Sequence, residues 1–161
     1  MINFYGVGIW IDLLTLICAF FGFIVLIWQN RRRGKIEKCQ FMLNLEQPFR
    51  DGEKFREVHR KTVEKEKISD TADIHIYLSF FENFYPLIQN KLLKYSEIDK
   101  QFGYRFFIAT HNEDMQSEIT KHKEYFSNLL DLYYEWFHYR EKRGLEIPDK
   151  NKKLDKSQLE K

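Results

Sequence analysis

The chain has 161 residues, and its 26 Lys and Arg residues nearly balance its 24 Asp and Glu residues, so that the formal net charge at pH 7 is +2. A charge this small creates no global field that would attract nucleic acid. Two cysteines form neither a disulfide framework nor the spacing of a zinc site. These features exclude a disulfide-rich scaffold and leave room for one folded domain.

The first predicted element is an apolar helix from Gly6 to Trp28. Asp12 and Thr15 are the polar residues in this stretch of 23 residues. At about 1.5 Å per residue it reaches roughly 35 Å, enough to cross a hydrocarbon core about 30 Å thick. We predict a membrane-spanning helix rather than a cleaved signal, because its leading residues carry no positive side chain and no small-residue cleavage site follows.

An arginine triplet, Arg31, Arg32 and Arg33, follows the apolar stretch almost at once. Positive flanks of a membrane helix stay in the cytoplasm and are attracted to anionic lipid headgroups. We therefore expect a single-pass protein with its N-terminus outside, its C-terminal domain in the cytoplasm and the lipid bilayer as a partner.

Small and polar residues share one face of the predicted span, because they recur at alternating steps of four and three. Small residues let helices approach closely in lipid, and a carboxylate inside the membrane has to face protein or water. The pattern predicts a packing seam between copies or the wall of a pore, although Asp12 could instead reach the outer interface. This small-polar stripe consists of Gly8, Asp12, Thr15, Ala19, Gly22, Leu26, Gln29 and Arg33.

The remainder of the chain has the apolar periodicity of helices, and no stretch alternates as a strand requires. We expect an all-α fold in which one N-terminal transmembrane helix is followed by a cytoplasmic helical bundle. The predicted parts are a transmembrane anchor (1–30), a basic juxtamembrane helix that ends at Pro48 (31–50), a helical domain (51–146) and a polar tail without a tertiary role (147–161).

Four helices are expected in the domain, each starting at a residue whose side chain can accept a backbone hydrogen bond. The second should kink at Pro86, and the last and longest should run to about Arg143, where Gly144 stops it. The predicted starts are Asp51, Ser69 or Asp70, Ser96 and Ser117.

Aromatic residues make up 17% of the chain and are concentrated between Tyr77 and Tyr139. Because aromatic side chains bury large areas, we interpret them as core and subunit contacts. A surface that stacks RNA bases is the functional alternative, and the sequence YYEWFHYR has the required mixture of rings and arginine.

The sequence contains no glycine-rich phosphate loop, no zinc spacing and no nucleophile elbow. We therefore expect no cofactor and no metal. The scattered imidazoles of His59, His75, His122 and His138 are interpreted as surface groups. The exception is the segment QFGYRFFIATHNED, in which Arg105 precedes His111 by six positions.

The pair of Arg105 and His111 on a late helix of a bundle resembles the HEPN motif of RNA-cleaving and defence-associated proteins. In that family two copies meet, the histidine performs acid and base chemistry on the ribose, and the arginine holds the phosphate. Imidazole and guanidinium suit these tasks. Phe106 departs from the pattern, because the family commonly places a polar residue there. Six positions also turn a helix by about 600°, which leaves the two side chains roughly 120° apart.

The whole architecture is similar to the Csx-type accessory membrane protein of type VI-B CRISPR systems, which carries a divergent HEPN-like domain. The resemblance implies a ring-forming homo-oligomer in the bacterial inner membrane. It implies a pore that depolarises the membrane and enhances antiviral defence alongside an RNA-guided RNase. It further implies that the Arg105 and His111 pair is degenerate, so that the protein is not an enzyme, and that Asp12, Thr15 and Gln29 face the lumen.

Two other functions are compatible with the sequence. A membrane-tethered HEPN ribonuclease would bind RNA and use Arg105 and His111 as its catalytic pair. An anchored adaptor would bind a partner through its cytoplasmic helices, with neither pore nor cleavage.

Overall fold

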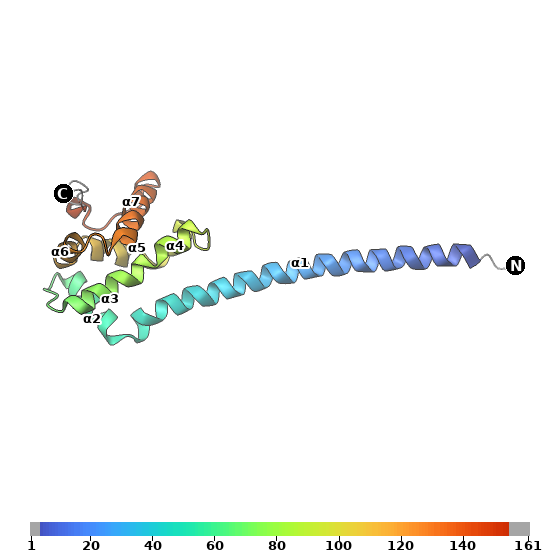
Figure 1. The fold of residues 1–161 in the computed structure, drawn as a ribbon, viewed down its shortest axis with the longest axis horizontal. Coiled ribbons are helices and arrows are strands. Elements are labelled where there is room, and N and C mark those ends of the chain that lie inside the picture. The colour runs from blue at the N-terminus through green and yellow to red at the C-terminus, as the bar shows by residue number, and fades with distance from the viewer. Residues whose placement is uncertain (1–3, 155–161) are drawn as a thin grey trace. The chain divides into compact units, whose positions relative to one another are not determined.

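The computed structural model describes residues 4–154, with side chains from residue 20 onward. It confirms the predicted all-α class, because every regular element in that range is a helix (Figure 1). The elements are α1 (Phe4–Asp51), α2 (Glu53–Glu64), α3 (Thr71–Glu82), α4 (Phe84–Gln89), α5 (Tyr95–Thr110), α6 (Glu113–Lys121), α7 (Ser127–Lys142) and the 3-10 helix η1 (Lys150–Lys152).

The chain divides into two compact units between Arg50 and Asp51. The first unit contains α1 up to Arg50, and the second contains all the later helices. The division falls at the junction expected between the juxtamembrane helix and the helical domain.

Helix α1 is continuous from Phe4 to Asp51 and passes through Gly34 without a break. It ends three residues beyond Pro48, so the predicted end was wrong. A proline lacks only its own N–H, and the residues after it can still donate helical hydrogen bonds. Asp51 is therefore the last residue of α1 rather than a cap, and Gly52 occupies the cap position of α2.

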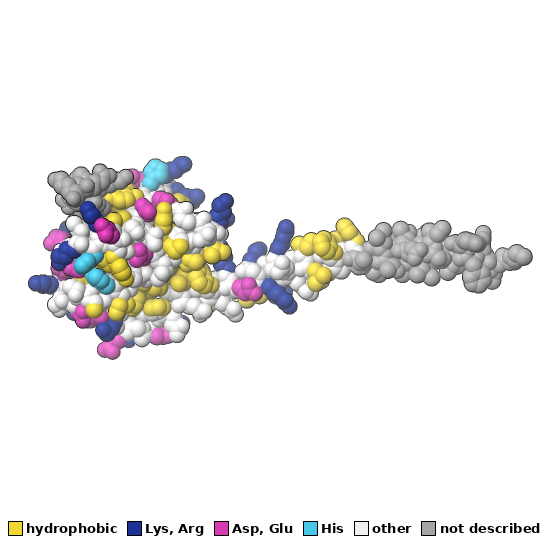
Figure 2. Space-filling view, in the orientation of Figure 1, with side chains coloured by type: hydrophobic (Ala, Val, Ile, Leu, Met, Phe, Trp, Pro, Cys, Tyr) yellow, Lys and Arg dark blue, Asp and Glu magenta, His cyan; other side chains and the backbone are white. Residues whose placement is uncertain are grey.

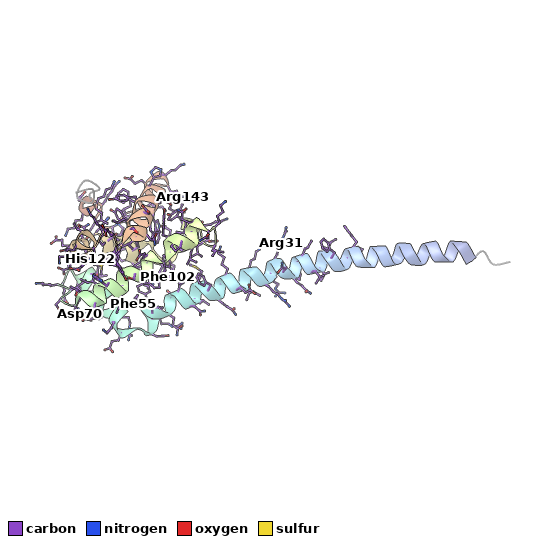
Figure 3. All side chains as sticks on the ribbon, in the orientation of Figure 1. Arg31, Phe55, Asp70, Phe102, His122 and Arg143 are labelled. Carbon is purple, nitrogen blue, oxygen red and sulfur yellow. The ribbon has the colours of Figure 1, made fainter. Side chains whose placement is uncertain are left out.

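Large apolar side chains of α1 are exposed before the arginine triplet, from Phe20 (64% exposed) to Trp28 (61%). Figure 2 shows these hydrophobic groups beside the Lys and Arg side chains that follow, and Figure 3 labels Arg31. The Arg32 guanidinium lies 5.7 Å from the centre of the Trp28 ring.

Within the described part of the chain, no helix has both the length and the apolar character that crossing a membrane requires. The side chains of residues 6–19, more than half of the predicted span, lie outside the described side chains. Of the small-polar stripe, the side chains of Gly8, Asp12, Thr15 and Ala19 lie outside the described residues.

The second unit has an aromatic core, as predicted. Helix α3 packs against α2, α4, α6 and α7, and α5 packs against α2, α6 and α7. Phe102, which is labelled in Figure 3, is fully buried on α5. One turn later Phe106 stacks on Trp136 of α7, with ring centres 4.7 Å apart. Tyr125, in the same aromatic-rich stretch, is 61% exposed.

Helix starts follow the predicted chemistry at some positions. The Asp70 carboxylate caps α3 by accepting hydrogen bonds from the backbone N–H groups of Ala72 (2.9 Å) and Asp73 (3.4 Å). Helix α5 starts before Ser96, because the Glu97 carboxylate accepts from the backbone N–H of Lys94 at 2.9 Å. The earlier start satisfies a donor that the helix itself leaves unpaired.

Pro86 does not kink a long helix, because the chain turns three residues earlier, at Asn83. Pro86 then lies in the first turn of α4, where its missing N–H removes no helical hydrogen bond. Two short helices thus replace the predicted kinked one.

The single long helix expected after Ser117 was also wrong. Asn112 starts α6 by accepting from the backbone N–H groups of Asp114 and Met115, and α6 ends at Lys121. Helix α7 begins at Ser127 after Phe126, which is fully buried. Gly144 follows α7 with a φ of +63°, the left-handed conformation expected of a helix-ending glycine.

The segment that follows α7 packs onto the domain, which corrects the expectation for the described part of the tail (147–154). Ile147 and Leu154 are buried. The Leu154 N–H donates to the hydroxyl oxygen of Tyr133 on α7 at 3.2 Å. The burial of Ile147 and Leu154 and the hydrogen bond to Tyr133 hold this charged segment against the domain.

Candidate functional site

His111, half of the predicted HEPN-like pair, is the C-cap residue of α5 and is buried. Its Nδ1 lies 2.6 Å from the carbonyl oxygen of Pro148 and its Nε2 lies 2.8 Å from the Tyr133 hydroxyl oxygen. A carbonyl oxygen can only accept, so Nδ1 carries the proton and Nε2 of the neutral ring accepts from Tyr133. Burial lowers the pKa of His111 below 6.5, although the Pro148 carbonyl and Asp149 oppose this shift.

Arg105, the other half of the pair, influences a different group of side chains. Burial lowers the pKa of His59 on α2, and the positive charge of Arg105 lowers it further. Burial raises the pKa of Tyr77 on α3, and Arg105 partly offsets this. The Tyr77 hydroxyl oxygen lies 3.4 Å from Nδ1 of His59. Within one chain, Arg105 therefore belongs to a group with α2 and α3, whereas His111 is bound to α7 and the tail.

A cavity of about 220 Å³ adjoins His111, and Arg105 does not line it. Its ionic groups include ion pairs between Lys152 and Glu113 (2.7 Å) and between Lys65 and Asp149 (3.5 Å). Four carboxylates and three ammonium groups line the cavity in all, an excess of negative charge that does not favour a phosphate. These residues are Glu66, Glu113, Asp114, Asp149, Lys65, Lys67 and Lys152.

The described members of the small-polar stripe lie on exposed helix surface. Leu26, Gln29 and Arg33 line one shallow hollow on α1. A Cβ atom added at Gly22 would meet no atom within 4 Å. The arginine triplet is exposed as well. The stripe therefore presents a continuous face in its described part, with the polar Gln29 between an apolar and a charged residue.

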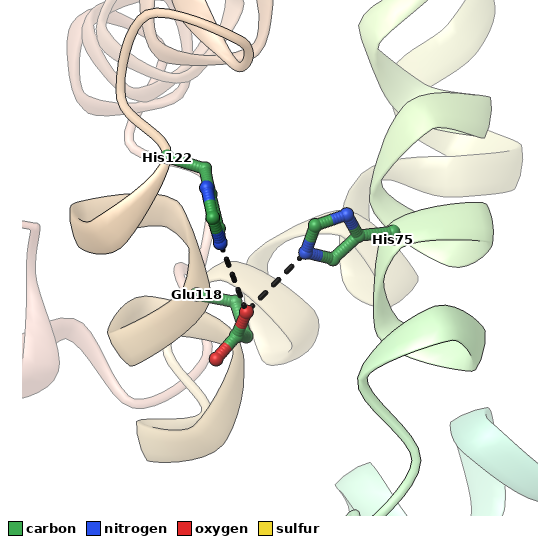
Figure 4. A group of neighbouring side chains, drawn as sticks. All are labelled: His75, Glu118 and His122. Atoms are coloured by element: carbon green, nitrogen blue, oxygen red, sulfur yellow. Dashed lines mark hydrogen bonds and ion pairs between the residues drawn. The ribbon is translucent and has the colours of Figure 1, made fainter.

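His75, Glu118 and His122 form a second group, which the sequence did not predict (Figure 4). His75 comes from α3, Glu118 from α6, and His122 is the C-cap of α6. Oε2 of Glu118 lies 3.3 Å from Nε2 of His75 and 3.7 Å from Nε2 of His122. Among the described residues, this is the group of histidine, cysteine and acidic side chains whose ligand atoms converge, all within 4.8 Å.

The carboxylate of Glu118 is buried, and its two oxygen atoms have different neighbours. Lys121 Nζ lies 2.6 Å from Oε1, and Oε2 is turned toward the two imidazoles. The hydrogen bond from Lys121 is the main reason that the pKa of Glu118 is lowered, and the adjacent histidines act in the same direction. The charge of Glu118 is thus paired with Lys121, while its Oε2 faces the two imidazoles.

One signal for this group exists in the sequence. Glu118 and His122 are four residues apart, which places them on one face of a helix. His75 is 43 positions upstream of Glu118, and only the packing of α3 on α6 brings it there. His75 and His122 were predicted to be surface imidazoles, and their shared contact with Glu118 was not predicted.

No family model, curated protein or solved structure matches this chain.

Proposed function

We propose that this protein is a membrane-anchored homo-oligomer whose N-terminal helices line a pore that depolarises the membrane. The observation that supports it most is the run of exposed apolar side chains in α1 directly before three arginines. In water, exposing Phe20 to Trp28 is unfavourable, whereas lipid or a second helix would cover them. The arginine triplet suits the cytoplasmic headgroup region.

The small-polar stripe supports association of several copies. Gln29 and Arg33 are polar groups at the end of an apolar segment, and they share a hollow with Leu26. Polar side chains in membrane helices face protein or water. If the stripes of several copies face one another, the polar side chains of Asp12 and Thr15, farther upstream on the stripe, would also face protein or water.

The biological setting comes from the resemblance to the Csx-type accessory membrane protein and to its HEPN-like bundle. On that basis the pore acts in a bacterial inner membrane and strengthens antiviral defence beside a type VI-B effector RNase. Arg105 and His111 serve structure rather than catalysis in this proposal. The burial of His111 and its hydrogen bonds to Pro148 and Tyr133 favour that role.

The test is release of an ionic dye from liposomes that contain the purified full chain. We expect leakage from the wild type and an altered leak from Gln29→Leu, which removes a polar group from the stripe. Gln40→Leu is the matched control, because Gln40 is exposed on the same helix but lies beyond the arginine triplet. Its leak should equal that of the wild type.

Intact vesicles at high protein-to-lipid ratio would contradict the pore. Particle symmetry after detergent extraction separates the alternatives, because a closed ring fits a pore and a two-fold dimer fits a HEPN ribonuclease. RNA cleavage by the wild type that is lost in His111→Ala, at unchanged assembly size, would establish the ribonuclease instead. A protein with neither leak nor cleavage would be an adaptor.

A further inference from the structure

We propose that His75, Glu118 and His122 form a binding site for a divalent transition metal, with Zn²⁺ as the best fit. The site joins α3 to the end of α6 and is independent of the pore (Figure 4). Two neutral imidazoles and one carboxylate are a ligand set that zinc uses in proteins when a fourth position is left to water.

The ligand atoms of the three side chains lie within 4.8 Å of one another, close enough for one metal ion to draw them together. Charge-assisted hydrogen bonds between nitrogen and oxygen are about 2.7–2.9 Å long. The two distances from Glu118 Oε2 to the imidazole nitrogens are 3.3 and 3.7 Å, and the second exceeds any hydrogen bond. Around a tetrahedral ion with bonds of about 2.0–2.1 Å, ligand atoms lie about 3.3 Å apart. Rotations of the partly exposed imidazoles, which bring the atoms from separations of up to 4.8 Å to this spacing, would complete the set.

The Glu118 carboxylate is oriented for metal binding, although its ion pair with Lys121 offsets its charge. Lys121 binds Oε1 of Glu118, so it fixes the carboxylate while leaving Oε2 directed at both Nε2 atoms. A group that holds the non-ligating oxygen in this way orients the ligand. Both nitrogens that face Oε2 can supply lone pairs when their rings are protonated at Nδ1.

The site is open on one side, where an ion can enter. The side chains of His75 and His122 are 33% and 50% exposed, whereas that of Glu118 is 7% exposed. Phe126 covers the inner side, because its ring lies edge to face with that of His75 at 5.3 Å. A buried carboxylate below two accessible imidazoles leaves the remaining coordination position to solvent.

The test uses the full chain in detergent, without a histidine tag, after removal of metal by a chelator. Isothermal titration with Zn²⁺ should show one ion per chain and a raised thermal midpoint. Co²⁺ should give visible absorption bands of a four-coordinate site with nitrogen and oxygen ligands. His75→Gln and His122→Gln should each weaken Zn²⁺ binding by at least tenfold, because each removes one ligand of three.

His138→Gln is the control, since its imidazole is exposed on α7 and should leave the affinity unchanged. Circular dichroism checks that the variants fold. A wild type without four-coordinate Co²⁺ bands, or ligand variants that bind Zn²⁺ as tightly as the control, would overturn the proposal. The wild-type spectrum decides the matter even if a variant fails to fold.

Discussion

His111 was paired with Arg105 in the sequence, but in the structure it forms hydrogen bonds with Pro148 and Tyr133. It follows α5 directly and links the tail, through Pro148, to α7, through Tyr133. The Tyr133 hydroxyl in turn accepts from the Leu154 N–H. These contacts form a continuous chain of hydrogen bonds that holds the segment after α7 against the domain.

Replacing this imidazole should therefore destabilise the domain. His111→Ala leaves the Pro148 carbonyl and the Tyr133 hydroxyl without their partner and opens a cavity, which we expect to cost about 2–4 kcal/mol. His138→Ala removes an exposed imidazole and should change stability by less than about 0.5 kcal/mol. Urea unfolding monitored by Trp136 fluorescence, with Trp10 and Trp28 replaced by Phe, measures both. Equal effects of the two substitutions would contradict this role.

The lowered pKa of His111 predicts a loss of stability in mild acid. The folded chain binds this proton less readily than the unfolded chain, in which the value is 6.5. The stabilising contribution is therefore complete above that value and decreases as the pH falls below it, until the folded pKa is reached. His59 acts in the same direction, because its pKa is also lowered by burial.

The comparison that isolates His111 is the change in thermal midpoint between about pH 7.5 and about pH 5.5 in the wild type and in His111→Gln. The variant should lose less stability over this interval, since one of the two imidazoles with a lowered pKa is gone. An identical change in both proteins would show that His111 does not titrate as described.

Individual helices depend on local caps, and α3 offers the clearest case. Asp70 accepts from two backbone N–H groups of its first turn. Asp70→Ala should lower the free energy of unfolding by about 0.5–2 kcal/mol, and Asp70→Asn should lower it much less because the amide oxygen still accepts. Chemical unfolding of the three proteins tests this ranking, and equal stability of the alanine and asparagine variants would rule out the cap as the cause.

At the scale of the whole molecule, the chain consists of the helix α1 and a bundle that starts at Asp51. The proposed membrane orientation places Cys39, which is exposed and free, on the cytoplasmic side. In a Cys18→Ser background, a membrane-impermeant maleimide should label Cys39 only after the cells are permeabilised. Asn3→Cys, in a chain without the other two cysteines, is the control for the outer side. Labelling of Cys39 in intact spheroplasts would reverse the orientation.

The sequence by itself determined the helical class, the aromatic core and several helix ends, because these depend on local spacing and on the conformations of single residues. Phe81 and Phe102 belong to the aromatic-rich stretch that was expected to form the core, and both are buried. Gly144 was expected after a helix end and has a positive φ there. The exposed apolar run of α1 is also visible in the sequence, as are the three arginines that follow it.

Only the tertiary structure decided where long-range partners meet. Helical periodicity continues through the break between α6 and α7 and therefore does not predict it. Phe126, which lies in the break, is buried. His75 reaches Glu118 and His122 because α3 packs on α6. Arg105 and His111 were paired by their spacing, but a helix turns them roughly 120° apart and different neighbours surround them. Spacing along the sequence determines which residues share one face of a helix, and tertiary packing determines which faces of different helices come into contact.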